Sequence, residues 1–80
     1  MEWIKSHEDC YDWEQSDGMV HLQCFRADSN SQWRSVAIVD TFSRMSTHLF
    51  DDLEKAKWMA AMIARAMLLM ALKDVNDLLR

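Results

Sequence analysis

The residue types in this chain that are best suited to chemistry form two pairs of a histidine and a cysteine. His7 precedes Cys10 by three residues, and His21 precedes Cys24 by the same interval. Imidazole nitrogens and thiolates are the usual ligands of structural zinc, and a Cys–His pair can also form a covalent catalyst. Whether either chemistry is possible depends on the elements that position these side chains.

The spacing of the pairs argues against both a zinc site and a catalytic site. Residues three apart on a strand point to opposite faces of a sheet, and His21 and Cys24 lie in the clearest strand pattern of the chain. Zinc knuckles bend at Gly or Pro, whereas this chain has no proline and its one glycine, Gly18, lies in a predicted turn. A nucleophilic cysteine also needs a cleft and an orienting third group. We therefore expect a non-enzymatic protein with no catalytic, metal or cofactor site.

The first half of the chain predicts antiparallel strands. Asp17-Gly18 is typical of a two-residue type I′ hairpin turn, because glycine adopts the positive φ and aspartate tolerates it. Such a turn pairs residues whose numbers sum to 35, so that Trp13 lies opposite Leu22 and the apolar residues share one face. The stretch 1–6 could begin the first strand.

A third strand and an ambiguous connection follow the hairpin. Residues 33–40, WRSVAIVD, predict a strand with Val36 and Ile38 on one face and Trp33, Ala37 and Val39 on the other. Its register stays open, because the loop before it is long and both faces are apolar. Residues 41–50 fit either a fourth, edge strand or an irregular connection.

Residues 52–79 predict one long helix, because they contain no Gly or Pro and are rich in Ala, Leu and Met. Asp51 and Glu54 have the spacing of an N-cap and its capping-box partner. The core-facing stripe is predicted to comprise Leu53, Ala56, Ala60, Ala64, Met67, Leu68, Ala71, Val75 and Leu78. The chain is therefore expected to form a single α+β domain over residues 1–80. An antiparallel sheet of three or four strands in 1–49 precedes a helix in 50–80, packed on one face.

The helix also carries apolar residues on the side opposite the predicted core stripe. Trp58, Met62 and Leu69 form a strip there, with Arg65 beside it. One explanation is that the helix kinks or wraps, so that both sides are buried within one chain. The other is a second interface, against another copy or a different protein, and we expect a two-fold homodimer in which this strip meets its own copy. The run from Trp58 to Leu72 is too short for a membrane span and contains Arg65.

Charge restricts the class of partner. The formal net charge is −4, which argues against a general nucleic-acid binder. An acidic cluster of Glu8, Asp12, Glu14 and Asp17 lies along the first predicted strand. It fits either a solvated strand that resists edge pairing or a patch that binds a basic protein surface. The N-terminus, MEWIKSHEDC, has no apolar signal segment, so we expect a cytoplasmic protein.

The layout of the whole chain is marked by Trp3, the Asp17-Gly18 turn, the strand QWRSVAIVD and a helix opened by DDLEKAK. This layout resembles that of small phage-encoded proteins, some of which are anti-CRISPR inhibitors. The resemblance implies a single-domain inhibitor that binds a host protein, such as a nucleic-acid-binding CRISPR effector subunit, and blocks DNA binding or cleavage. It carries no individual residue role. The alternative is a self-associating structural or adaptor protein whose helix forms a homodimer.

Overall fold

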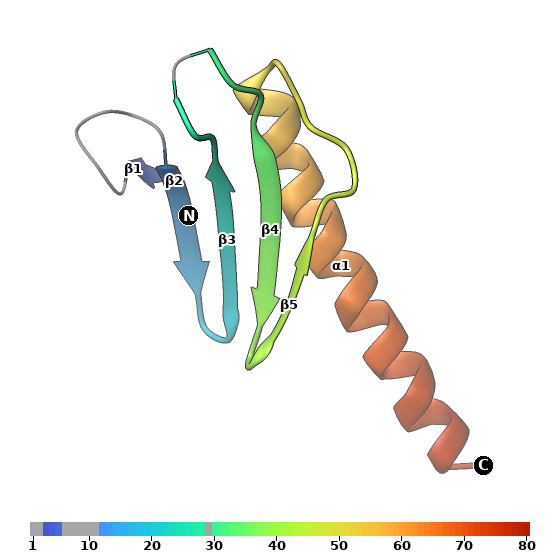
Figure 1. Ribbon diagram of the computed structural model, residues 1–80. Helices are drawn as coiled ribbons and strands as arrows, with labels where there is room; N and C mark the ends of the chain where they lie inside the picture. The colour runs from blue at the N-terminus through green and yellow to red at the C-terminus, as the bar shows by residue number, and fades with distance from the viewer. Residues whose placement is uncertain (1–2, 6–11, 29) are drawn as a thin grey trace.

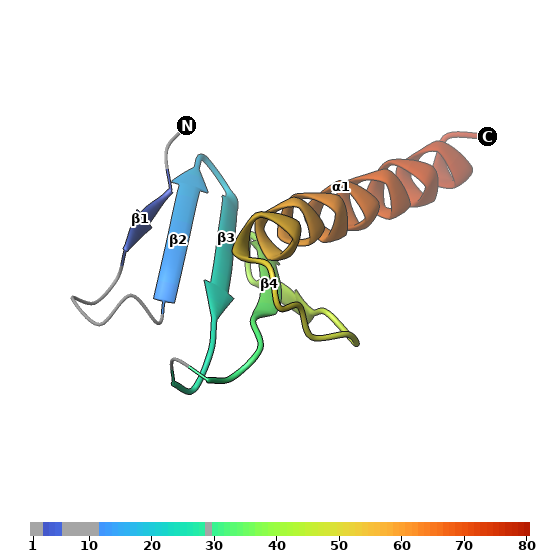
Figure 2. The same cartoon turned by 90° about the horizontal axis from the view of Figure 1, so that it is seen from above.

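One antiparallel sheet and one helix make up the described part of the chain, residues 3–5, 12–28 and 30–80, in the computed structural model (Figure 1). The elements are β1 (Ile4–Lys5), β2 (Asp12–Asp17), β3 (Val20–Phe25), β4 (Arg34–Val39), β5 (Phe42–Met45) and α1 (Leu53–Leu78). The strands lie in sequence order across the sheet. Figure 2 shows α1 crossing one face of this sheet. The predicted α+β arrangement, a sheet followed by one long C-terminal helix, is confirmed. The described residues form five strands rather than the predicted three or four, because Ile4–Lys5 pairs with β2 as a separate strand instead of beginning it.

The first hairpin turns one residue later than predicted. Trp13 pairs with Cys24 and Asp17 pairs with Val20, so paired numbers sum to 37 and Gly18 and Met19 form the turn. Only Gly18 of these two has a positive φ, +61°, which is the sign pattern of a type II′ turn. The predicted type I′ turn and its register are therefore wrong. Because the error is two residues, every side chain keeps its predicted face.

The register of β4, left open by the sequence, is set by its pairing with β3. Leu22 lies opposite Ala37 and Cys24 lies opposite Ser35. The predicted faces of β4 are confirmed, because Trp33, Ala37 and Val39 belong to the core under the helix. Residues 41–50 combine both alternatives. Phe42–Met45 form edge strand β5 and the residues after it connect to the helix.

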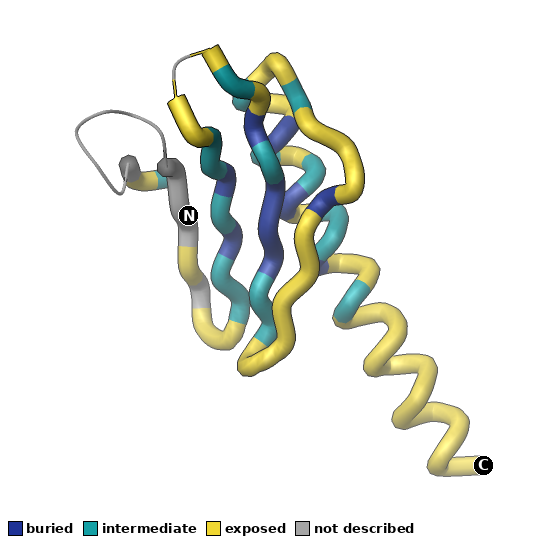
Figure 3. The backbone as a smooth tube through the Cα atoms, viewed as in Figure 1, coloured by how far each residue is buried: buried dark blue, intermediate teal, exposed yellow. Residues whose placement is uncertain are grey.

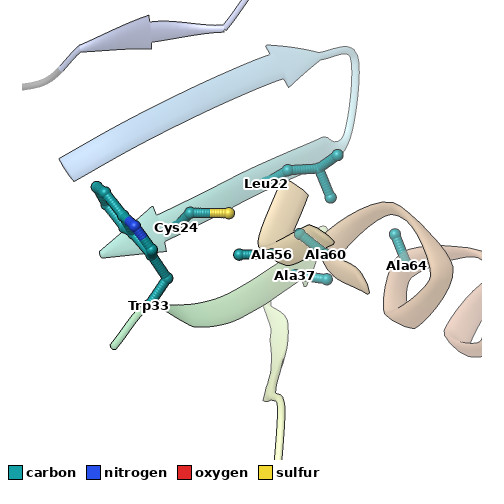
Figure 4. Close-up of a cluster of buried hydrophobic side chains, with 7 residues drawn as sticks. All are labelled: Leu22, Cys24, Trp33, Ala37, Ala56, Ala60 and Ala64. Carbon is teal, nitrogen blue, oxygen red and sulfur yellow. The ribbon is translucent and has the colours of Figure 1, made fainter. Parts of the chain in front are cut away.

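Small residues let the helix lie close to the sheet. Ala56, Ala60 and Ala64 recur once per turn of α1 and are buried. The Ser35 hydroxyl donates a hydrogen bond of 2.6 Å to the carbonyl oxygen of Ala56, joining β4 to the helix. Leu22, Cys24, Ala37 and Trp33 complete the buried cluster in Figure 4. A row of alanines therefore forms the contact between the two layers.

The helix begins at Leu53, and Asp52 is its N-cap. The Asp52 carboxylate accepts a hydrogen bond of 3.0 Å from the backbone N–H of Glu54. The predicted cap, Asp51, instead accepts a bond of 2.9 Å from the Gln32 side-chain amide. Both backbone hydrogen bonds of the Trp33–Phe50 bridge hold the chain just before Asp51 against the start of β4. The predicted Asp51 cap is therefore wrong by one residue.

Replacing Asp52 with alanine is expected to lower the free energy of unfolding by about 1 kcal/mol, because a helix N–H loses its partner. Asp51→Ala is the matched control, since it removes only an exposed side-chain bond and should cost a few tenths of a kcal/mol. Urea denaturation followed by circular dichroism measures both. A loss for Asp51→Ala as large as that for Asp52→Ala would contradict this assignment of the cap.

The helix is much longer than the sheet that it covers. Its 26 residues span about 39 Å, whereas six-residue strands span roughly 20 Å. Every residue from Leu68 to Arg80 is exposed (Figure 3). We call residues 68–80 the overhang. The predicted core stripe is correct up to Met67 and wrong for Leu68, Ala71, Val75 and Leu78, which are exposed and lie outside the core cluster.

Candidate protein-binding surfaces

The overhang exposes a dense set of large apolar side chains. Seven lie within the twelve residues 68–79, namely Leu68, Leu69, Met70, Leu72, Val75, Leu78 and Leu79. At about 100° per residue, Leu68, Leu72, Val75 and Leu79 share one side with Ala71 and Leu78. Lys73, Asn76 and Asp77 lie on the other side. The overhang is thus an amphipathic helix whose apolar side is unsupported within one chain.

A groove continues this apolar side toward the sheet. It has a volume of about 380 Å³ and lies along the flank of α1 beside β3. Val20 and Leu22 line it from the sheet, and Ala61, Ala64 and Leu68 line it from the helix. The helix side is shallow because two of its lining residues are alanines. Exposed apolar surface therefore runs without interruption from the middle of α1 to its C-terminal end.

A second hollow lies on the opposite flank of α1. It measures about 270 Å³ and is bounded by β5, the connection after β5 and the helix. Phe50, Met59, Ile63 and Met67 supply most of its apolar lining. Both long edges of the helix–sheet contact are therefore apolar and open.

The predicted dimer strip lies on the outer side of α1, opposite the row of buried alanines. Trp58 and Leu69 are 59% and 53% exposed, Arg65 is exposed, and Met62 is half-buried. α1 is a single unbroken helix. The helix therefore does not bury Trp58 or Leu69 by kinking or wrapping, and the homodimer through this strip stays a prediction.

The acidic cluster is divided between the two faces of the sheet. Glu8 lies outside the described residues. Asp12 and Glu14 pair with Phe25 and Gln23, on the face away from α1. Asp17 is an odd number of residues from Asp12 and Glu14, so it lies on the other face, where it is paired with Val20 on the α1 side. Within the described residues, β1 covers the edge of β2 at only two positions, Trp13 and Glu14.

The residues of the sheet that point away from α1 form a second surface, which we call the open face. On this face, Asp12 and Glu14 of β2 lie beside apolar residues of the neighbouring strands. Ile4 and Met45 are exposed there, Phe25 and Ile38 are half-buried, and Val36 is buried. No helix covers this face within residues 3–5, 12–28 and 30–80 (Figure 2). It is a mixed surface of apolar and charged positions, with acidic residues on β2 and Arg34 on β4, and its β2 side suits contact with a basic protein.

The histidine and cysteine pairs form no reactive group in the part of the chain that is described. His7 and Cys10 lie outside it, and His21 and Cys24 lie on opposite faces of β3. Burial raises the pKa of the Cys24 thiol to about 11, opposed by its hydrogen bond with Ser35, so the thiol stays protonated at neutral pH. The same residues contain no group of three metal-ligating side chains. Cys24 is thus a core residue.

Comparison with protein-family models, curated proteins and solved structures finds no match to this chain. Across the described ranges, no helix combines the length and hydropathy needed to cross a membrane. The function has to be inferred from the surfaces described above.

Proposed function

We propose that this protein is a non-enzymatic protein-binding inhibitor of the phage type, acting like the anti-CRISPR proteins that its layout resembles. The observation that supports this most directly is the open face, where acidic positions on β2 share a surface with the exposed side chains of Ile4 and Met45 and with the half-buried ones of Phe25 and Ile38. Exposed apolar groups are tolerated singly, but grouped on one uncovered face they favour a contact surface. The open face is the part of the molecule that meets the target.

The target is expected to present a basic surface. The chain carries a net charge of −4, and two of its carboxylate positions, Asp12 and Glu14, share the open face. Opposite charges speed encounter and orient the partners, while apolar contacts at the centre hold them together. A nucleic-acid-binding subunit of a CRISPR effector in the host cytoplasm has the required chemistry. Occupying that subunit would block DNA binding or cleavage.

A second candidate is a self-associating structural or adaptor protein. The exposed apolar side chains of α1, Trp58 and the overhang among them, favour it because a second copy could cover them. The two functions differ in whether a host protein is retained once the chain has associated with itself.

A tagged pull-down from lysate of a phage-sensitive bacterium, read by mass spectrometry, tests the proposal. The double variant Asp12→Lys with Glu14→Lys should lose the captured host protein at low salt. Asp74→Lys with Asp77→Lys is the matched control, because it reverses the same charge on the overhang and should retain the capture. Failure of the wild type to retain any host protein, with a stable homodimer alone, would establish the structural alternative. Equal loss of the captured host protein in both variants would show that the open face does not hold the target.

A further inference from the structure

We propose that a second copy of this chain covers the overhang, with the two α1 helices packed antiparallel and each C-terminal end lying in the groove of the other. This interface is separate from the open face, and it shares Arg65 and Leu69 of the outer strip but does not include Trp58. It goes beyond the proposed function, since it can be measured with no target present.

The first support is the spacing of the apolar residues. Small and large apolar residues recur at alternating intervals of three and four along one side of α1. They are Ala61, Ala64, Leu68, Ala71, Val75 and Leu78. This is the a/d pattern of helices that pack side by side. It starts inside the groove and continues to the end of the helix, so one partner helix could cover all of it.

The second support is that the chain complements itself in one antiparallel register. When paired residue numbers sum to 139, Leu78 lies opposite Ala61 and Leu68 lies opposite Ala71, while Val75 lies beside Ala64, which is already buried against the sheet. Each of the two exposed layers then joins a large residue to an alanine, and the two-fold axis repeats both. The exposed end of one helix, with Leu78 at 85% exposed, would fill the groove of about 380 Å³ beside Ala61.

Other helix pairings fit less well. Moving the antiparallel register by one heptad would place Leu68 against Leu78 and leave the groove unfilled. A parallel pairing would place alanine against alanine at three positions and would leave both grooves open. The antiparallel register with sum 139 is therefore the one that uses both the groove and the overhang.

Charge agrees with this pairing. Arg65 lines the groove, where the same register would place it opposite Asp74 of the partner subunit, a pair of opposite charges.

Light scattering and sedimentation equilibrium on the full chain test the pairing. The wild type should be a dimer at tens of micromolar. Leu78→Glu should weaken association at least about 100-fold, because one buried leucine is lost from each copy. Trp58→Glu is the matched control on the outer strip and should leave the dimer intact. Both positions are exposed in the monomer, so circular dichroism should show both variants folded.

Exchanging a small and a large side chain between two facing positions tests the register itself. Ala61→Leu alone should weaken the dimer by overfilling the groove, and Leu78→Ala alone should weaken it by leaving space. Combining the two should restore association to within a fewfold of the wild type, because these residues face each other. A monomeric wild type, a dimer that survives Leu78→Glu, or loss of the dimer only with Trp58→Glu would overturn the proposal. A double variant weaker than either single variant would overturn the register.

Discussion

Trp33→Ala is expected to lower the free energy of unfolding by about 3–5 kcal/mol, the range for truncating a buried aromatic side chain. Trp33 is only 4% exposed, and it lies in the cluster that joins β3, β4 and the alanine row of α1. The Arg26 guanidinium carbon lies 4.4 Å from the centroid of its ring. A loss of this size is a large fraction of the stability of a small domain, about 5–15 kcal/mol.

Trp58→Ala is the matched control, because it removes the same side chain from a position that is 59% exposed. Its cost to the monomer should be within about 0.5 kcal/mol. Urea denaturation followed by far-ultraviolet circular dichroism suits both variants, because each one loses a tryptophan and with it part of the fluorescence signal. A similar cost for the two substitutions would mean that the core is not where the structure places it.

The sheet illustrates what a period of two can and cannot predict. The alternation of apolar and polar residues along 12–25 and 33–39 correctly assigned the core face. A residue's face of the sheet depends only on whether its number is odd or even along the strand. The hairpin register depended on the choice of turn, and a lone glycine fits both primed types. A type II′ turn requires positive φ only at its first position, so Gly18 could occupy that position while Asp17 stayed in the ladder. Sequence pattern alone did not distinguish the two turns.

The helix shows a different limit. Its apolar stripe was predicted to continue to Leu78, and periodicity does place Leu68, Val75 and Leu78 on the same side as the alanines. Periodicity says nothing about where the sheet beneath ends. A comparison of lengths would have found the overhang, since a helix of about 40 Å cannot be covered along its length by strands of roughly 20 Å.

The predicted binding residues fared unevenly for local reasons. Asp12 and Glu14 share a face because they are two residues apart, whereas Asp17 differs in parity and lies on the α1 side. The outer strip was placed correctly on the exposed side of α1. The groove beside Val20 could not have been predicted, because it depends on how closely two alanines bring the helix to β3.

The amides of residues 69–79 are expected to exchange with solvent at least about 100-fold faster than those of residues 56–64 in dilute protein. Overhang amides lose protection by local fraying, which costs almost nothing, whereas amides in the alanine row require the helix to leave the sheet. An unsupported helical segment of this length is marginal in water. The difference reflects the absence of buried residues beyond Met67 in α1.

The most direct test of the account is therefore hydrogen exchange along α1, followed by mass spectrometry from submicromolar to tens of micromolar protein. The backbone amides of residues 69–79 should be weakly protected from exchange at the lowest concentration, and their protection should increase as the second copy binds. Residues 56–64 should be protected throughout and serve as the internal reference. Protection of 69–79 equal to that of 56–64 at the lowest concentration would show that the overhang is packed within one chain, which would contradict the account.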